Sequence, residues 1–354
     1  MRRIPADIAV DFNQVSIVFG DKPELALPLM DKGLERAEVH HASGQILGVH
    51  NCTLQLRRGE ILVLMGLSES GKSTLLRAVN GLNSIAKGQL NITTSQDNIE
   101  LGSLTAAQLT MLRRQHIAMV FQQFGLLPWR TVTENVGLGL ELAGISSDEH
   151  SSRVAKQLEL VGLTDRADAR IAELSGGMQQ SVGLARAYAT DASILLMDEP
   201  FLALDPLIRD HLQAELLDHQ KKLGCSITFV SHDLDEAFRL GDRIAIMEGG
   251  RIVQIGTPRE IFHAPSTEYV ANFVAQINPL SVLIAEDILS FATPTAKSKK
   301  GGQTISATTP ANQIIHQLDQ TEYPLSVLQN NKIIGQIDKS AVLACLAHFT
   351  DNRQ

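Results

Sequence analysis

The sequence has little cysteine. Its 354 residues contain three, Cys52, Cys225 and Cys345. They lie far apart, form an odd set and show none of the spacings that bind metals. Such usage is typical of a reducing compartment, where free cysteines commonly act as small apolar residues. The cysteines therefore predict neither a disulfide framework nor a metal site.

Long apolar runs are missing as well. No stretch reaches the roughly 18 residues that a helix needs to cross a bilayer. The opening stretch, MRRIPADIAVDF, is interrupted by Asp7 and Asp11, unlike the apolar core of a secretion signal. We expect a chain that is not secreted and does not span a membrane alone.

An excess of positive charge is also absent. The 31 Lys and Arg residues stand against 39 Asp and Glu, for a formal net charge of -8. A negative field repels the phosphate backbone that dominates affinity for nucleic acids. We therefore expect no nucleic-acid partner.

The sequence does contain a series of short apolar runs, at 61–65, 117–121, 193–198 and 226–231. Continuous runs of this length suit parallel strands that are covered on both faces. Helical patterns stand between several of them, and RIAIMEGGRIVQIG at 243–256 reads as a hairpin around Gly-Gly. This alternation predicts an α/β sheet, which the hairpin closes.

The remaining segments predict two additions to that sheet. Residues 124–190 hold mostly helical patterns without a clear strand, which indicates a helical insert. After residue 278 the character changes, and 292–312 is polar, small and basic, as in a flexible loop. A strand, turn, strand and helix pattern follows. We therefore predict two domains, 1–278 and 279–354, the second a small α+β module.

A phosphate-binding motif, GLSESGKST, directly follows the first apolar run and precedes a helical pattern. This is the strand, loop and helix context that G-x-x-x-x-G-K-[ST] requires. Glycines let successive N–H groups turn toward one anion, Lys72 supplies a cation, and Ser73 is placed to hold Mg²⁺. A glycine turn that caps a helix is the alternative. The predicted nucleotide-binding residues here are Gly66, Leu67, Ser68, Glu69, Ser70, Gly71, Lys72, Ser73 and Thr74.

Two adjacent carboxylates, Asp198 and Glu199, end the apolar run in LLMDEP. A buried strand rarely ends in two acids without a cation or a proton to handle. Asp198 is placed to orient Mg²⁺ through its water shell, and Glu199 to polarise the water that attacks the γ-phosphate. The alternative is a pair of helix-capping acids before Pro200.

The segment LSGGM at 174–178 by itself only begins a helix. Because it follows the phosphate loop and precedes the paired acids, it resembles the signature motif of ABC ATPases. This resemblance covers most of 8–278 and implies a P-loop NTPase of the ABC-ATPase type, with a mixed sheet and a helical subdomain. In that family ATP lies between the phosphate loop of one subunit and the signature motif of another. The resemblance thus implies a homodimer in which ATP is also contacted, in trans, by Ser175, Gly176, Gly177 and Asp205.

Other positions match the same family. Gln122 corresponds to its Q-loop, ALD at 203–205 to its D-loop, and His232 to its H-loop, which positions the γ-phosphate. Phe19 stands where the family has an aromatic that stacks on adenine, although a core aromatic is the alternative. The implied catalytic residues are Lys72, Glu199 and His232, and the implied Mg²⁺ ligands are Ser73, Gln122 and, through water, Asp198.

The stretch between Phe19 and the run at 61–65 is unusually long. With MGLS, RAVNGL, MVFQQFGLLPWRTV and DPLIRD, it is similar to the ATPase subunits of quaternary-amine importers, which take up glycine betaine, proline betaine or choline. That resemblance implies separate transmembrane permease subunits, an extracytoplasmic substrate-binding protein or domain, and a location at the cytoplasmic face of the inner membrane. Residues 279–348 are similar to one CBS module, with a degenerate dimerisation tail as the alternative.

Three positions depart from the family pattern. Glu69 stands where the phosphate loop usually has Gly, Ser181 where Arg follows the signature, and Leu202 where the D-loop has Ser. Glu69 removes a conformationally free residue and brings negative charge toward the phosphates. The departures leave open a regulatory subunit that binds ATP with weak turnover, and the resemblance leaves open an importer ATPase for another small solute.

Overall fold

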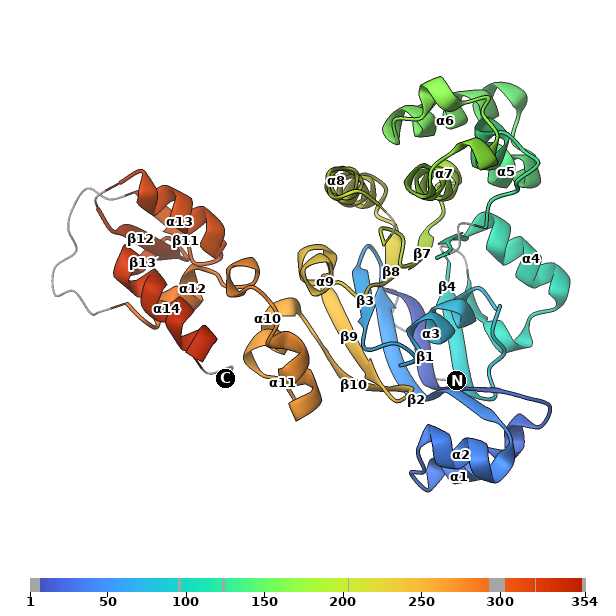
Figure 1. Ribbon diagram of the computed structural model, residues 1–354, viewed down its shortest axis with the longest axis horizontal. Helices are drawn as coiled ribbons and strands as arrows, with labels where there is room; N and C mark the ends of the chain where they lie inside the picture. The colour runs from blue at the N-terminus through green and yellow to red at the C-terminus, as the bar shows by residue number, and fades with distance from the viewer. Residues whose placement is uncertain are drawn as a thin grey trace. The chain divides into compact units, whose positions relative to one another are not determined.

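The computed structural model describes residues 7–94, 97–122, 125–202, 204–292, 303–321 and 323–351. The chain divides into two compact units, coloured mainly blue to yellow and orange to red in Figure 1. The first comprises Met1–His232 and Leu240–Ile255, and the second Asp233–Arg239 and Gly256–Gln354. The domain boundary that the sequence placed at residue 278 lies inside the second unit and stays a prediction.

The first unit is built around a six-stranded sheet in the order β10-β9-β3-β8-β7-β6. The five strands from β9 to β6 run parallel, and β3, β7 and β8 are buried along their whole length. Apolar side chains on both faces explain the continuous runs in the sequence and confirm the predicted α/β sheet. The strands are β3 (Ile61–Met65), β6 (Ile117–Val120), β7 (Ile194–Asp198), β8 (Ser226–Val230), β9 (Arg243–Glu248) and β10 (Arg251–Gly256).

A second, antiparallel sheet has the order β2-β1-β4-β5. One continuous cluster of buried side chains joins both sheets to α3 (Lys72–Val79), which contributes Leu75 and Leu76. This shared core fixes where α3 begins, at the carboxyl end of β3. The strands of this sheet are β1 (Ile8–Phe19), β2 (Ile46–Arg57), β4 (Lys87–Thr93) and β5 (Asn98–Glu100).

The long stretch after β1 folds into a small helical insert. It contains η1 (Pro23–Leu25), α1 (Leu27–Asp31) and α2 (Arg36–Ser43). A core of its own, with Met30 and Val39 at its centre, packs the insert on the ends of β1 and β2. Figure 1 shows this insert in blue, beside the antiparallel sheet.

The segment predicted to be a helical insert is helical. Residues 125–190 contain helices and an isolated bridge between Thr131 and Arg170, but no strand. Their apolar faces share a cluster of buried residues, and α5, α6 and α7 lie together in Figure 1. The helical elements of the first unit after α3 are η2 (Leu101–Ser103), α4 (Ala106–Gln115), α5 (Val132–Ala143), α6 (Ser147–Leu160), η3 (Thr164–Arg166), η4 (Ile171–Glu173), α7 (Gly176–Ala189) and α8 (Pro206–Leu223).

The second unit has a three-stranded sheet, in which β12 pairs parallel with β11 and antiparallel with β13. Its buried Asp287 accepts a hydrogen bond from Arg259 at 2.7 Å, which ties α10 to α12. The elements are α9 (Leu234–Leu240), α10 (Pro258–His263), α11 (Glu268–Val274), η5 (Pro279–Ser281), α12 (Ala285–Leu289), β11 (Thr304–Ser306), α13 (Ala311–Asp319), β12 (Leu325–Gln329), β13 (Lys332–Ile337) and α14 (Lys339–Asp351).

The predicted strand, Asn-Asn turn, strand and helix correspond to β12, Asn330 and Asn331, β13 and α14, with positive φ at both asparagines. The loop predicted over 292–312 differs. Residues 293–302 lie outside the described residues, whereas β11 and the start of α13 occupy part of 303–312. None of the helices in the described parts of the chain is both long enough and apolar enough to cross a membrane.

The packing of α7 on α8 predicts a pH dependence. His219 of α8 stacks on Tyr188 of α7 with ring centroids 4.6 Å apart, and burial lowers the pKa of His219. The unfolded chain binds this proton near the ordinary pKa of about 6.5, before the folded protein does. The free energy of unfolding therefore falls as the pH drops below about 6.5, and this fall ends once folded His219 is also protonated.

Replacing His219→Phe removes that contribution. We expect the midpoint of urea unfolding to fall less in the variant than in the wild type between about pH 7.5 and about pH 5.5. The matched control is His211→Phe at an exposed position of the same helix, which should keep the wild-type difference. An unchanged pH dependence in His219→Phe would contradict the assignment.

Candidate functional site

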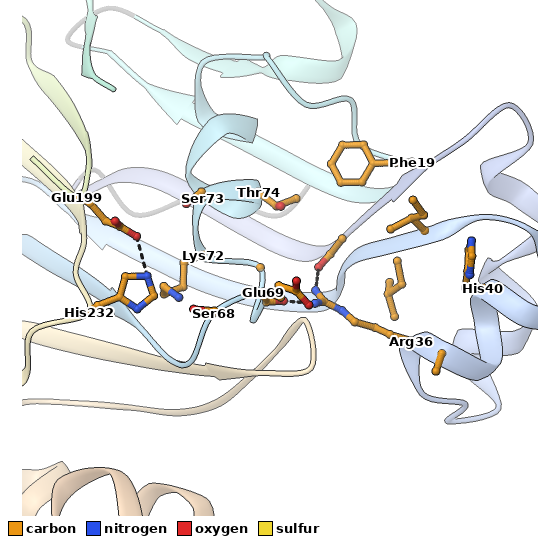
Figure 2. A pocket seen from close by; sticks show the side chains of 15 residues that line it. Phe19, Arg36, His40, Ser68, Glu69, Lys72, Ser73, Thr74, Glu199 and His232 are labelled. Carbon is orange, nitrogen blue, oxygen red and sulfur yellow. Dashed lines mark hydrogen bonds and ion pairs between the residues drawn. The ribbon is translucent and has the colours of Figure 1, made fainter. Parts of the chain in front are cut away.

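The phosphate loop is packed so closely that only glycine fits at its two ends. Gly66 has φ 144°, and a Cβ there would lie 2.2 Å from the Met247 carbonyl oxygen. Gly71 has φ 99°, and a Cβ there would lie 2.7 Å from Val49 Cγ1. The backbone between these glycines borders a pocket of about 630 Å³, shown in Figure 2. The structure thus brings most of the predicted loop residues to one cavity.

Lys72 lies at the base of this pocket and is 4% exposed. Its Nζ donates to the carbonyl oxygens of Gly66 at 2.9 Å and Leu67 at 2.8 Å. Burial lowers the pKa of Lys72, while the carboxylates of Glu199 and Asp198 act in the opposite direction. A buried ammonium held by neutral acceptors is a strong binding group for a phosphate.

Asp198, at the end of β7, is fully buried and accepts two hydrogen bonds from α3. Ser73 Oγ donates to Oδ1 at 2.7 Å, and Arg77 Nη2 donates to Oδ2 at 2.8 Å. Ser73 and Asp198 were predicted from the sequence as site residues, whereas Arg77 was not. Its position four residues after Ser73, on the same helix face, was the available signal.

Glu199 is held between the ends of the two neighbouring strands. Gln122, which follows β6, donates from Nε2 to Glu199 Oε2 at 2.8 Å. His232, which follows β8, places Nε2 2.7 Å from Glu199 Oε1, as the dashed line in Figure 2 marks. The sheet order β8-β7-β6 thus gathers all three side chains at one edge, where ligands of open α/β sheets bind.

The side chains around Asp198 fit a magnesium ion. Mg²⁺ prefers oxygen ligands and commonly takes one or two carboxylates together with substrate phosphates. The Ser73 hydroxyl and the Asp198 carboxylate provide such oxygens beside the phosphate loop. Gln122 has its amide nitrogen on Glu199, and its role as a ligand stays a prediction.

Phe19 lies at the rim of the same pocket and is 40% exposed. Gly48 leaves room for its ring, because a Cβ at Gly48 would lie 2.8 Å from Phe19 Cε2 and 2.9 Å from Thr74 Cγ2. The ring is therefore not a buried core aromatic, and it is accessible to a base. Figure 2 shows it on the side of the pocket away from His232.

The predicted signature residues lie elsewhere on the first unit. Ser175 caps α7 by accepting from Met178 N at 3.3 Å, and Asp205 caps α8 by accepting from Leu207 N at 3.0 Å. Ser175, Gly176 and Asp205 are exposed. None of the described residues that line the phosphate pocket comes from either helix start. Ala203 of the D-loop lies outside the described residues.

Comparisons with known proteins agree with this geometry. The profile of the ABC transporter family matches residues 49–202. The glycine betaine/proline betaine transport system ATP-binding protein ProV of Salmonella typhimurium is 41% identical over 96% of this chain and 83% of its own length. The chain belongs to the ABC transporter family. It is an ABC-type ATPase, and the predicted fold and family resemblance are confirmed.

Further relatives of this ABC ATPase extend the match. The glycine betaine transport ATP-binding protein OpuAA of Bacillus subtilis is 45% identical over 83% of this chain and 69% of its own. The trimethylamine N-oxide transport system ATP-binding protein TmoW of Ruegeria pomeroyi is 41% identical over 93% and 94%. A solved dimeric post-hydrolysis state of the ATP-binding cassette MJ0796, bound to ADP and Pi, has a TM-score of 0.61 and 30% identity, covering 71% of this chain and 99% of that chain.

The three departures from the family pattern occupy different surroundings in this ABC ATPase. Glu69 has φ 64°, in the left-handed region that the more usual glycine adopts without strain. Ser181 is buried within α7, whereas Leu202 is 61% exposed. Only Glu69 lines the phosphate pocket of its own chain.

The glycine at the start of α3 offers a direct test of the loop. Gly71→Ala adds a Cβ against Val49 and the Gly48 carbonyl at an unfavourable φ. We expect the affinity for ATP to fall by at least about tenfold, because the loop must shift away from its phosphate-binding form. Equilibrium titration with ATP measures this.

Gly162→Ala is the matched control. Gly162 has φ 68°, but no atom lies within 4 Å of the added Cβ. This variant should lose a similar backbone contribution to stability and keep its ATP affinity. Equal affinities of the two variants would count against the close packing of the phosphate loop.

Proposed function

We propose that this ABC ATPase energises the uptake of a quaternary amine through separate transmembrane subunits. The clamping of Glu199 between Gln122 and His232 beside the phosphate loop is the observation that supports hydrolysis. The substrate class rests on relatives whose names specify glycine betaine, proline betaine and trimethylamine N-oxide transport. Uptake of choline is part of the same proposal, and so is the choice of one amine among these.

In the proposed mechanism, Lys72 and the loop amides stabilise the negative charge of the ATP phosphates. Glu199 polarises the attacking water, and His232 and Gln122 hold the Glu199 carboxylate in place. His232 would also position the γ-phosphate. Ser73 directly, and Asp198 through water, would hold Mg²⁺, which would neutralise charge on the ATP phosphates. The protein thus contributes mainly positioning and electrostatic stabilisation.

Replacing Glu199→Gln tests the catalytic assignment. The variant keeps the shape of the side chain but loses the charge that polarises water. We expect steady-state phosphate release by the assembled transporter to fall by roughly a hundredfold or more, with ATP binding retained. Glu248→Gln, at the exposed end of β9, is the matched control and should release phosphate at the wild-type rate. ATP binding without turnover in the wild type would favour the regulatory alternative.

The active assembly that we propose is a homodimer. Ser175, Gly176, Gly177 and Asp205 would contact ATP that is bound to the phosphate loop of the second copy. The exposure of Ser175, Gly176 and Asp205, and the separation of all four residues from the pocket of their own chain, support this. The related cassette MJ0796 is dimeric in its ADP-bound structure.

A groove of about 420 Å³ lies between the six-stranded sheet and the helices of residues 125–190. It is the proposed docking site for the transmembrane subunits. Phe121, one residue before Gln122, lines it together with Leu142 of α5 and Arg186 of α7. Arg186 Nη1 donates to the Gly125 carbonyl at 2.7 Å. A partner bound in this groove would contact both the helices of residues 125–190 and the segment that carries Gln122. Because Gln122 donates to Glu199, motion of the partner would reach the catalytic carboxylate.

Leu142→Glu tests this docking site. Leu142 is 50% exposed in the free chain, so the change should not disturb folding, but it places a charge in an apolar contact. We expect a loss of at least about tenfold in stimulation of phosphate release by the transmembrane subunits, with the basal rate retained. Leu223→Glu, at a similarly exposed position at the end of α8, is the control. Wild-type stimulation in Leu142→Glu would exclude the groove.

The C-terminal module is proposed to be a single CBS-like unit. The order β11, α13, β12, β13, α14, with one parallel and one antiparallel strand pair, supports this assignment.

We also propose an extracytoplasmic substrate-binding protein or domain as an indirect partner. The chain would then work at the cytoplasmic face of the inner membrane, held there by its transmembrane partners.

A further inference from the structure

An arginine from the small helical insert between β1 and β2 contacts the phosphate loop. Arg36, the first residue of α2, donates from Nη1 to the carbonyl oxygen of Glu69 and from Nη2 to that of Gly48. Figure 2 shows the side chain extending from the insert to the loop, with the bond to Glu69 as a dashed line. One guanidinium therefore joins three parts of the fold: α2, β2 and the phosphate loop.

The surroundings of this guanidinium form a fitted slot. A Cβ at Gly250, in the hairpin between β9 and β10, would lie 3.0 Å from Arg36 Nη2, and a Cβ at Gly71 would lie 3.4 Å from it. The hairpin and the phosphate loop are themselves joined, because Gly250 N donates to the Ser70 carbonyl at 3.1 Å. Arg36 thus occupies a space that glycines leave open on two sides.

The bond to Glu69 acts on the most strained residue of the loop. Glu69 has φ 64°, a left-handed conformation that is unfavourable for a residue with a Cβ. Because the peptide unit is planar and trans, holding the Glu69 oxygen on Arg36 turns the Ser70 N–H to the opposite side. Ser70 N donates to the Leu67 carbonyl oxygen at 3.2 Å, inside the loop.

The charges of Arg36 and Glu69 favour the same contact as the two hydrogen bonds. Burial lowers the pKa of Arg36, and the nearby Glu69 carboxylate opposes that change. The two side chains therefore attract each other beside the phosphate pocket. A cation at this place offsets the negative charge that Glu69 would otherwise present to the phosphates.

We propose that Arg36 is a positioning residue for ATP binding: it holds Glu69 in the left-handed conformation that glycine would adopt unaided, so that the helical insert is part of the nucleotide site. This rests on the proposed role of the phosphate loop. Arg36 and Glu69 then form a compensating pair. Each is tolerated because the other is present, and the insert gains a function beyond packing on the ends of β1 and β2.

A double-mutant cycle in the full-length chain tests the pair. ATP affinity is measured for wild type, Arg36→Ala, Glu69→Gly and the double variant. We expect Arg36→Ala alone to weaken ATP binding by about tenfold. Glu69→Gly should bind at least as tightly as wild type, and Arg36→Ala in that background should cost less than about threefold. Arg36→Lys should restore part of the affinity, because a Lys cation reaches the carbonyl with one donor group.

Controls separate the possible failures. His41→Ala changes an exposed residue of the same helix and should leave affinity unchanged. Lys72→Ala should lose ATP binding whatever the role of Arg36, and a wild type that does not bind ATP would refute the phosphate-loop function itself. Wild-type affinity in Arg36→Ala, or an equal loss in both backgrounds, would overturn the compensating pair. Urea unfolding of each variant shows whether a loss of affinity reflects a loss of fold.

Discussion

The site depends on a carboxylate that water does not reach. Asp198 ends a fully buried strand, and an isolated charge there would cost several kcal/mol. Arg77 of α3 supplies the opposite charge, and Ser73 of the same helix donates a second hydrogen bond. These bonds fix the start of α3 against the end of β7. They therefore set the distance between the phosphate loop and the next residue, Glu199, on which the proposed hydrolysis depends.

Much of this arrangement could be predicted from the sequence because its signals are local. Strands such as β3 and β8 are apolar on both faces, so each appears as an uninterrupted run. The phosphate loop carries its constraints in its own glycines, since Gly66 and Gly71 meet neighbouring atoms that exclude a Cβ. Parallel pairing of neighbouring strands then brings Gln122, Glu199 and His232 to one edge of the sheet.

The rest depends on contacts between distant segments. Arg36 and Glu69 are 33 residues apart, and the spacing of α2 does not indicate which of its side chains faces the loop. The segment around Ile305 shows the same difficulty: its polar, small residues indicate a loop, but parallel pairing with Val327 makes it a strand in which Ile305 is buried. Local composition carries no information about such a partner. The predicted loop therefore ended too late, whereas the hairpin of β12 and β13 was predicted from its asparagine turn.

The separation between the phosphate pocket and the start of α7 gives the proposed dimer a physical rationale. The helix N-terminus beyond Ser175 presents N–H groups and the positive end of a 14-residue helix. Both attract an anion, yet no described residue of this helix start lines the phosphate pocket of the same chain. ATP bound to Lys72 has a second, outward-facing side that such a helix start matches in charge. If a second chain supplies it, closure of the dimer depends on the triphosphate, and loss of the γ-phosphate removes the charge that holds the two surfaces together.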